Sequence, residues 1–106
     1  MMEAWLPCKV YIKVQKQKPR QAYVVLSPTF NYLKPQSYVV LSLKHPNGMV
    51  IQVPGRVARQ RGAGAVEIYI PVDAALTLAV WMGVKVEGNT AVYGYAVKIE
   101  SIHRPT

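Results

Sequence analysis

Two stretches of this sequence share the pattern Val-x-basic-Gln-basic, at residues 14–18 and 57–61. Each stretch leads through a short loop into an apolar segment that ends beside a proline, Pro28 or Pro71, and then into a segment of helical composition. We interpret this recurrence as two tandem units of about 45 residues each, residues 8–54 and 55–103. A unit of this length buries too little apolar surface to fold alone, so we expect the two units to complete one fold.

Alternating and β-branched patterns predict strands over most of the chain. His45-Pro46-Asn47-Gly48 has the composition of a turn, so residues 38–53 are expected to form a hairpin. Residues 73–82 favour a helix with Asp73 as its N-cap and Gly83 at its end. The predicted class is all-β with one or two short helices, the second being a helical turn at 29–33, and the predicted strands are 9–14, 22–26, 38–43, 49–53, 65–70, 84–86 and 91–102.

Two motifs recur in both units. Leu26-Ser27-Pro28 and Tyr69-Ile70-Pro71 place an apolar residue and a proline at a predicted strand end, and residues 33–39 and 82–89 follow the helical segments. Together they resemble AbrB-like (SpoVT/AbrB) swapped-hairpin DNA-binding domains, over roughly residues 9–102. The resemblance implies a swapped-hairpin β-barrel, formed here as an intrachain pseudo-dimer, and contact with duplex DNA through its basic loops.

The sequence departs from that family at three places. Gln36-Ser37 stands where the family has Gly-Asp, and Gly88-Asn89 stands there in the second copy with one extra residue upstream. Residues 74–82 are almost wholly apolar, whereas the family's helix carries charge. Residues 38–102 also fit the element order of an oligonucleotide-binding (OB) barrel, which is the alternative fold.

The charge of the chain is unevenly distributed. The formal net charge is +8, and ten of the 13 Lys and Arg residues lie between Glu3 and Glu67, a window without Asp or Glu. This asymmetry predicts a positive face, and a polyanion such as nucleic acid is the commonest partner of such a face.

The candidate nucleic-acid-binding residues lie in two basic stretches, which we expect to form loops. A pseudo-twofold barrel would bring both loops to one face, whereas the sequence alone leaves open whether they share it. Lys and Arg side chains there would neutralise phosphates and release counterions, and Arg59 and Arg61 are suited to guanine edges. The alternative is that Lys16 and Lys18 lie on an exposed strand edge and only block edge-to-edge pairing. The candidate residues are Lys13, Lys16, Lys18, Arg20, Arg56, Arg59 and Arg61.

Few residues suit catalysis or metal binding. Cys8 is the only cysteine, which excludes an internal disulfide and a thiolate zinc cage. His45 and His103 have no partner at metal-ligand spacing, and residues 62–64 lack the remainder of a phosphate-binding loop. We therefore expect no enzyme activity, no metal and no cofactor.

The sequence also predicts a location. No apolar run approaches the roughly 18 residues of a membrane-spanning helix. The first seven residues lack the basic region and apolar stretch of a signal peptide. We expect a cytoplasmic protein that does not enter a membrane.

Three function classes fit these observations. The first is an AbrB- or antitoxin-like transcriptional regulator that binds double-stranded DNA. The second is a non-specific or single-stranded nucleic-acid-binding protein of OB-like fold. The third is a barrel that docks a protein partner, or a second copy of the chain, through its apolar helix. In the second class the bases would stack on exposed tyrosines drawn from Tyr11, Tyr23, Tyr32, Tyr38, Tyr69, Tyr93 and Tyr95.

Overall fold

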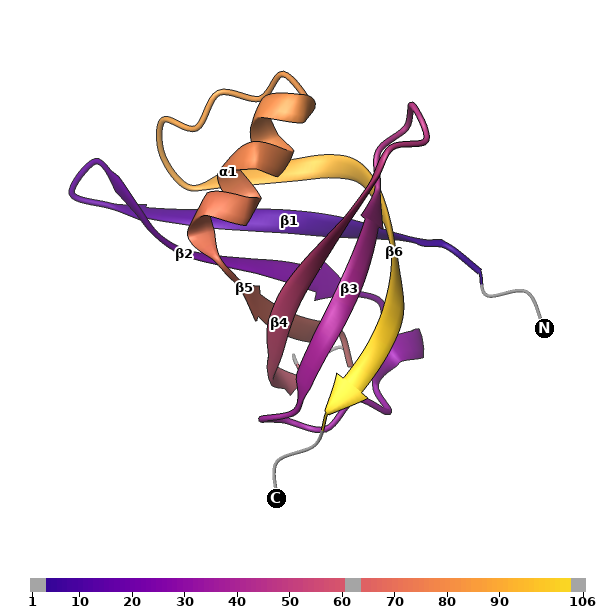
Figure 1. The fold of residues 1–106 in the computed structure, drawn as a ribbon. Coiled ribbons are helices and arrows are strands. Elements are labelled where there is room, and N and C mark those ends of the chain that lie inside the picture. Colours follow the sequence, from indigo (N-terminus) through magenta and orange to yellow (C-terminus); the bar gives the residue numbers. More distant parts are fainter. Residues whose placement is uncertain (1–3, 61–63, 104–106) are drawn as a thin grey trace.

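The computed structural model describes residues 4–60 and 64–103. Its strands are β1 (Leu6–Gln15), β2 (Lys18–Leu26), β3 (Tyr38–Lys44), β4 (Val50–Gln60), β5 (Val66–Ile70) and β6 (Thr90–His103); its helices are the 3-10 turn η1 (Pro28–Phe30) and α1 (Val72–Trp81). The strands close into an antiparallel barrel in the order β1-β2-β5-β4-β3-β6, and α1 lies over one end of it (Figure 1). The expectation of a mostly β chain with one clear helix is confirmed.

The strand order has an internal twofold relation. Exchanging β1, β2 and β3 for β4, β5 and β6 leaves every pair of neighbouring strands unchanged. Each half of the chain therefore runs strand, strand, helical segment, strand. The hairpin predicted at 38–53 forms, and it joins the two halves. The position between residues 54 and 55 lies inside β4, because that strand continues to Gln60 along β5.

The strand expected at 84–86 does not form, so the second half ends on one strand instead of two. The backbone at the start of this segment is hydrogen-bonded to the end of α1 and cannot pair as a strand. Gly83 adopts a positive φ of 68°, and the amides of Gly83 and Val84 donate to the carbonyls of Val80 and Ala79 at 3.0 and 2.9 Å. This is the Schellman arrangement that ends many helices, and it directs the chain into a loop.

Asp73 is not the N-cap of α1. The cap is Pro71, in an extended conformation, and its carbonyl accepts the first helical bond from the Ala75 amide at 3.2 Å. Because proline has no N–H to leave unpaired, it is well suited to a helix start. The Asp73 carboxylate lies in the first turn instead, where its Oδ1 accepts from the Ala74 amide at 3.0 Å.

The core fills the inside of the barrel with alternate residues of every strand, including Val10, Ile12, Val24, Leu41 and Ile68. The α1 residues Ala75, Leu78 and Ala79 are buried, so this side of the helix belongs to the core. The buried Tyr95 hydroxyl on β6 donates to the Leu78 carbonyl at 2.6 Å, which fixes α1 to the barrel. Among the described residues, no helix has both the length and the apolar character needed to cross a membrane.

Candidate nucleic-acid interface

The predicted basic residues lie mainly on strands rather than in loops. Lys16 and Gln17 form a two-residue turn between β1 and β2, with φ angles of 51° and 64°. Such a turn allows pairing as far as Gln15 and Lys18, so no basic loop forms there. Lys13 lies on β1, Lys18 and Arg20 on β2, and Arg56 and Arg59 on β4. Arg61 and the side chain of Arg59 lie outside what the structure describes.

The ends of the two basic stretches do not converge. Ala22 pairs with Ile70, and Leu26 pairs with Val66, which also pairs with Gln60. Lys18 begins β2, whereas Gln60 of β4 lies level with the other end of β2. The two are therefore separated by about 26 Å along the strand direction, at the usual rise per strand residue. In Figure 1 the β1–β2 turn lies at the left and the end of β4 at the bottom. The described ends of the two stretches are therefore not neighbours, because the strands between them are fully extended, and residues 61–63 of the second stretch lie outside the described residues.

The register instead brings tyrosines together on the outside of the barrel. Tyr11 pairs with Tyr23, Tyr23 with Tyr69, Tyr69 with Arg56, and Arg56 with Tyr38. These five residues form one line across β1, β2, β5, β4 and β3, and we call it the tyrosine row. At the usual spacing between strands it is about 19 Å long.

The rings of the tyrosine row contact one another and nearby cations. Tyr11 stacks on Tyr23 with 5.4 Å between ring centroids, and Tyr23 meets Tyr69 edge to face at 6.2 Å. Lys9 and Lys13 place their Nζ atoms 5.7 and 5.8 Å from the ring centroids of Tyr11 and Tyr23. Such cation–π contacts orient the ammonium groups along the row.

Arg56 has two partners within the interface. Its guanidinium carbon lies 5.7 Å from the Tyr69 ring centroid, and its Nη1 donates to Gln36 Oε1 at 2.9 Å. The Tyr69 ring and the Gln36 amide therefore hold the guanidinium on the surface of the barrel.

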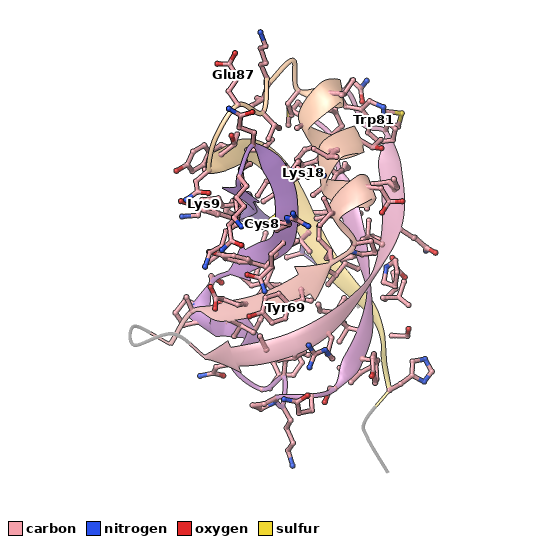
Figure 2. All side chains as sticks on the ribbon, turned by 90° about the vertical axis from the view of Figure 1, so that its left-hand side faces the viewer. Cys8, Lys9, Lys18, Tyr69, Trp81 and Glu87 are labelled. Atoms are coloured by element: carbon pink, nitrogen blue, oxygen red, sulfur yellow. The ribbon has the colours of Figure 1, made fainter. Side chains whose placement is uncertain are left out.

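Exposure differs along the tyrosine row. Tyr23 is only 4% exposed, Tyr38 is 58% exposed, and Tyr11 and Tyr69 are half-buried. Tyr23 therefore supports its neighbours, and the other three present ring surface to solvent. Tyr95 is also buried, so Tyr23 and Tyr95 are not among the exposed tyrosines that could stack on bases. Figure 2 shows Tyr69 on β5, with Lys18 nearer the α1 end of the barrel.

The cations near the tyrosine row are not neutralised by carboxylates of the described residues. The two described ion pairs lie elsewhere, Lys85 with Glu87 at 3.1 Å and Lys98 with Glu100 at 3.5 Å. Glu67 lies on β5 two residues before Tyr69, in the register Lys9–Val25–Glu67, and is 5% exposed. The positive charge of the face thus remains available to a ligand.

A hollow of about 440 Å³ opens beside the row, on the side where α1 begins. One residue from each basic stretch borders it, Arg20 from β2 and Arg56 from β4. The full lining is Arg20, Gln21, Ala22, Arg56, Tyr69, Ile70, Pro71 and Val72.

The groups that most often carry catalysis are engaged in the structure. Burial raises the pKa of the Cys8 thiol to about 12, and its Sγ lies 3.6 Å from the Tyr95 carbonyl, so the thiolate is scarce at neutral pH. His45 Nδ1 accepts from the Asn47 amide at 3.0 Å, and its Nε2 lies 2.9 Å from the Trp81 carbonyl. Within residues 4–60 and 64–103, no three His, Cys, Asp or Glu side chains gather as a metal site.

Comparison of the chain with protein-family models, with curated proteins and with solved structures finds no match. The resemblance to AbrB-like domains therefore stays a prediction from the sequence.

Sequence reasoning named the tyrosines individually but missed the row that they form. It also missed Lys9, which lies over Tyr11. Neither can be found without the cross-strand register, although the outward positions of Lys9, Tyr11 and Lys13 follow from the alternation within β1.

Proposed function

We propose that this protein binds nucleic acid on the tyrosine row and prefers single strands. The observation that carries the proposal is the single line of Tyr11, Tyr69, Arg56 and Tyr38 on the outside of the barrel, flanked by Lys9 and Lys13. Aromatic rings bind bases by stacking, and each stacked base contributes about 1–3 kcal/mol whatever its identity. The neighbouring ammonium groups supply the phosphate contacts.

A single strand suits this surface better than a duplex. In a duplex each base face is covered by its neighbours, whereas an unpaired base offers a free face to a ring. Three rings with solvent-accessible surface accommodate up to three bases. The absence of paired carboxylates beside Lys9, Lys13 and Arg56 in the described part of the chain favours binding that weakens as salt rises.

Duplex DNA is the second candidate ligand, as the resemblance to AbrB-like regulators implies. The twofold relation of the strand order supports an origin from two tandem units that complete one barrel, which is the intrachain form of the swapped-hairpin proposal. Under this alternative, Lys16 and Lys18 at the end of the β1–β2 hairpin contact the phosphates of the duplex.

A docking role for α1 receives less support from its packing. Ala75, Leu78 and Ala79 are buried against the barrel, and Val80 is the large apolar side chain of α1 that stays exposed, at 72%.

Fluorescence anisotropy distinguishes the two nucleic-acid ligands. A labelled 12-nucleotide single strand is bound to the protein and competed with unlabelled single strand or with duplex of the same length. We expect the single strand to compete better. We expect Tyr11→Leu and Tyr69→Leu each to weaken binding about tenfold, the loss of one stacked base, with an unchanged salt slope.

Tyr32→Leu is the matched control, because Tyr32 is exposed but lies outside the row. Better competition by duplex, together with tyrosine variants that bind like the control, would refute the single-strand proposal and favour the duplex alternative.

A further inference from the structure

Two arginines line the hollow beside the tyrosine row. Arg20 reaches it from β2 and Arg56 from β4. Neither arginine has an ion pair with a carboxylate of residues 4–60 or 64–103, and Asp73 does not line the hollow although α1 begins there. Two positive side chains that border one hollow repel each other in the free protein. A bound anion would relieve this repulsion.

The chemistry of the lining fits a phosphate group. Guanidinium groups present a planar fork of N–H donors that matches phosphate oxygens. Gln21 adds an amide donor, and Pro71 and Val72 place the start of α1 at the same border, where the helix dipole favours negative charge. The arginine pair is the primary determinant, and the helix start adds to it.

We propose that this hollow binds a phosphate group of a nucleic-acid strand between Arg20 and Arg56. The placement of the strand rests on the proposed function, whereas phosphate binding by the arginine pair does not. If the bases of the strand lie on the tyrosine row and one phosphate lies in the hollow, the sugar-phosphate backbone of the strand lies on the α1 side of the row. Lys13 and Gln21 pair with each other on that side, whereas the other side carries the carboxylate of Glu67.

The first experiment tests the hollow without a strand. Pyrophosphate is titrated into the full-length protein labelled with nitrogen-15, and the side-chain Nε–Hε signals of Arg20 and Arg56 are followed by NMR. We expect both signals to shift together and saturate in wild type, and the Arg56 response to weaken several-fold in Arg20→Gln. If neither signal moves, or if they respond no more than those of the other arginines, the proposal is overturned.

The second experiment measures strand binding by anisotropy at several salt concentrations. Arg20 lies outside the tyrosine row, so Arg20→Gln leaves the stacking surface intact. We expect it to weaken binding about tenfold and to lower the salt slope by about 0.7, the value for one phosphate of a single strand. Arg20→Lys keeps the charge but loses the fork, so we expect the wild-type slope with a smaller loss of affinity.

Lys85→Gln is the matched control, because it removes one exposed cation from the loop between α1 and β6. Equal salt slopes for Arg20→Gln and Lys85→Gln would overturn phosphate binding in the hollow without contradicting base stacking on the tyrosine row. If wild type binds no strand at all, the proposed function fails. The pyrophosphate titration alone then decides whether the hollow binds phosphate.

The source of the phosphate is resolved with three otherwise identical strands that carry a 5′-phosphate, a 3′-phosphate or none. A gain from one terminal phosphate that disappears in Arg20→Gln identifies a strand-end site. Equal affinities that all fall in Arg20→Gln identify an internal phosphodiester. A gain from a terminal phosphate that persists in Arg20→Gln would place that phosphate outside the hollow and count against the proposal.

Discussion

Replacement of Gly55 by alanine is the sharpest test of how closely β4 packs in the barrel. Gly55 is buried and its missing side chain faces inward. A Cβ atom there would lie 2.5 Å from Ile68 Cγ2, 3.2 Å from the Tyr69 carbonyl oxygen and 3.4 Å from Val39 Cγ2. Ile68 is β-branched and stiff, and the second neighbour is backbone, so neither can give way without moving β5.

The expected loss of stability follows from these contacts. Overpacking a core costs about 1–3 kcal/mol, and a contact at 2.5 Å belongs at the upper end. Alanine also lowers the chain entropy of the unfolded state relative to glycine, which offsets about 0.4–1 kcal/mol of this loss in the free energy of unfolding. The net loss is about 2 kcal/mol, which lowers the melting temperature by roughly 8–16 °C in a domain of this size.

Urea unfolding followed by circular dichroism measures this loss, with Gly88→Ala as the control. Gly88 is exposed and a Cβ atom there meets nothing within 4 Å, so we expect a change below about 0.5 kcal/mol. In an Ile68→Ala background the cost of Gly55→Ala should shrink by about 1–2 kcal/mol, because the clashing methyl is gone. Equal stability of Gly55→Ala and wild type would show that β4 and β5 do not approach as described.

Three further predictions concern single groups. The raised pKa of Cys8, about 12, together with its burial, should make alkylation by iodoacetamide at pH 8 roughly a thousandfold slower in the native protein than in urea; similar rates would contradict this. The Ser42 hydrogen bond of 2.6 Å is the main cause of the lowered pKa of Glu100. Its stabilising effect is therefore present above the ordinary glutamate pKa and lost as the pH falls, so Glu100→Gln should flatten the acid limb of a stability–pH curve, and an unchanged limb would exclude this role. Tyr95→Phe should cost about 1 kcal/mol in urea unfolding, because it removes the buried hydrogen bond to α1, and a neutral effect would show that this bond does not stabilise the barrel.

Much of the secondary structure could be predicted because it depends on local patterns. Alternation along β1, the Asn-Gly turn of the hairpin and the Gly83 end of α1 all act over a few residues. The errors have tertiary causes. Val84 donates back to the helix instead of starting a strand, and β4 extends past residue 53 because β5 is there to pair with it.

The candidate site was less predictable than the fold. Arg20 and Arg56 were named from charge alone, and the structure shows that they border one hollow. Lys16 and Lys18, named on the same grounds, lie at the far end of the hairpin from the β4 residues. Charge identifies which residues repel one another, but only the path of the strands determines which of them become neighbours.

By itself, the sequence determined the strand-rich composition, the recurrence of two similar halves and the excess of positive charge, because these are properties of the chain read in order. The tertiary structure alone determined that Tyr11, Tyr23, Tyr69, Arg56 and Tyr38 share one row. Those residues come from five strands, and their alignment depends on backbone hydrogen bonds between segments distant in sequence. A shift of one residue in any of these pairings would turn a tyrosine from the outer face to the core.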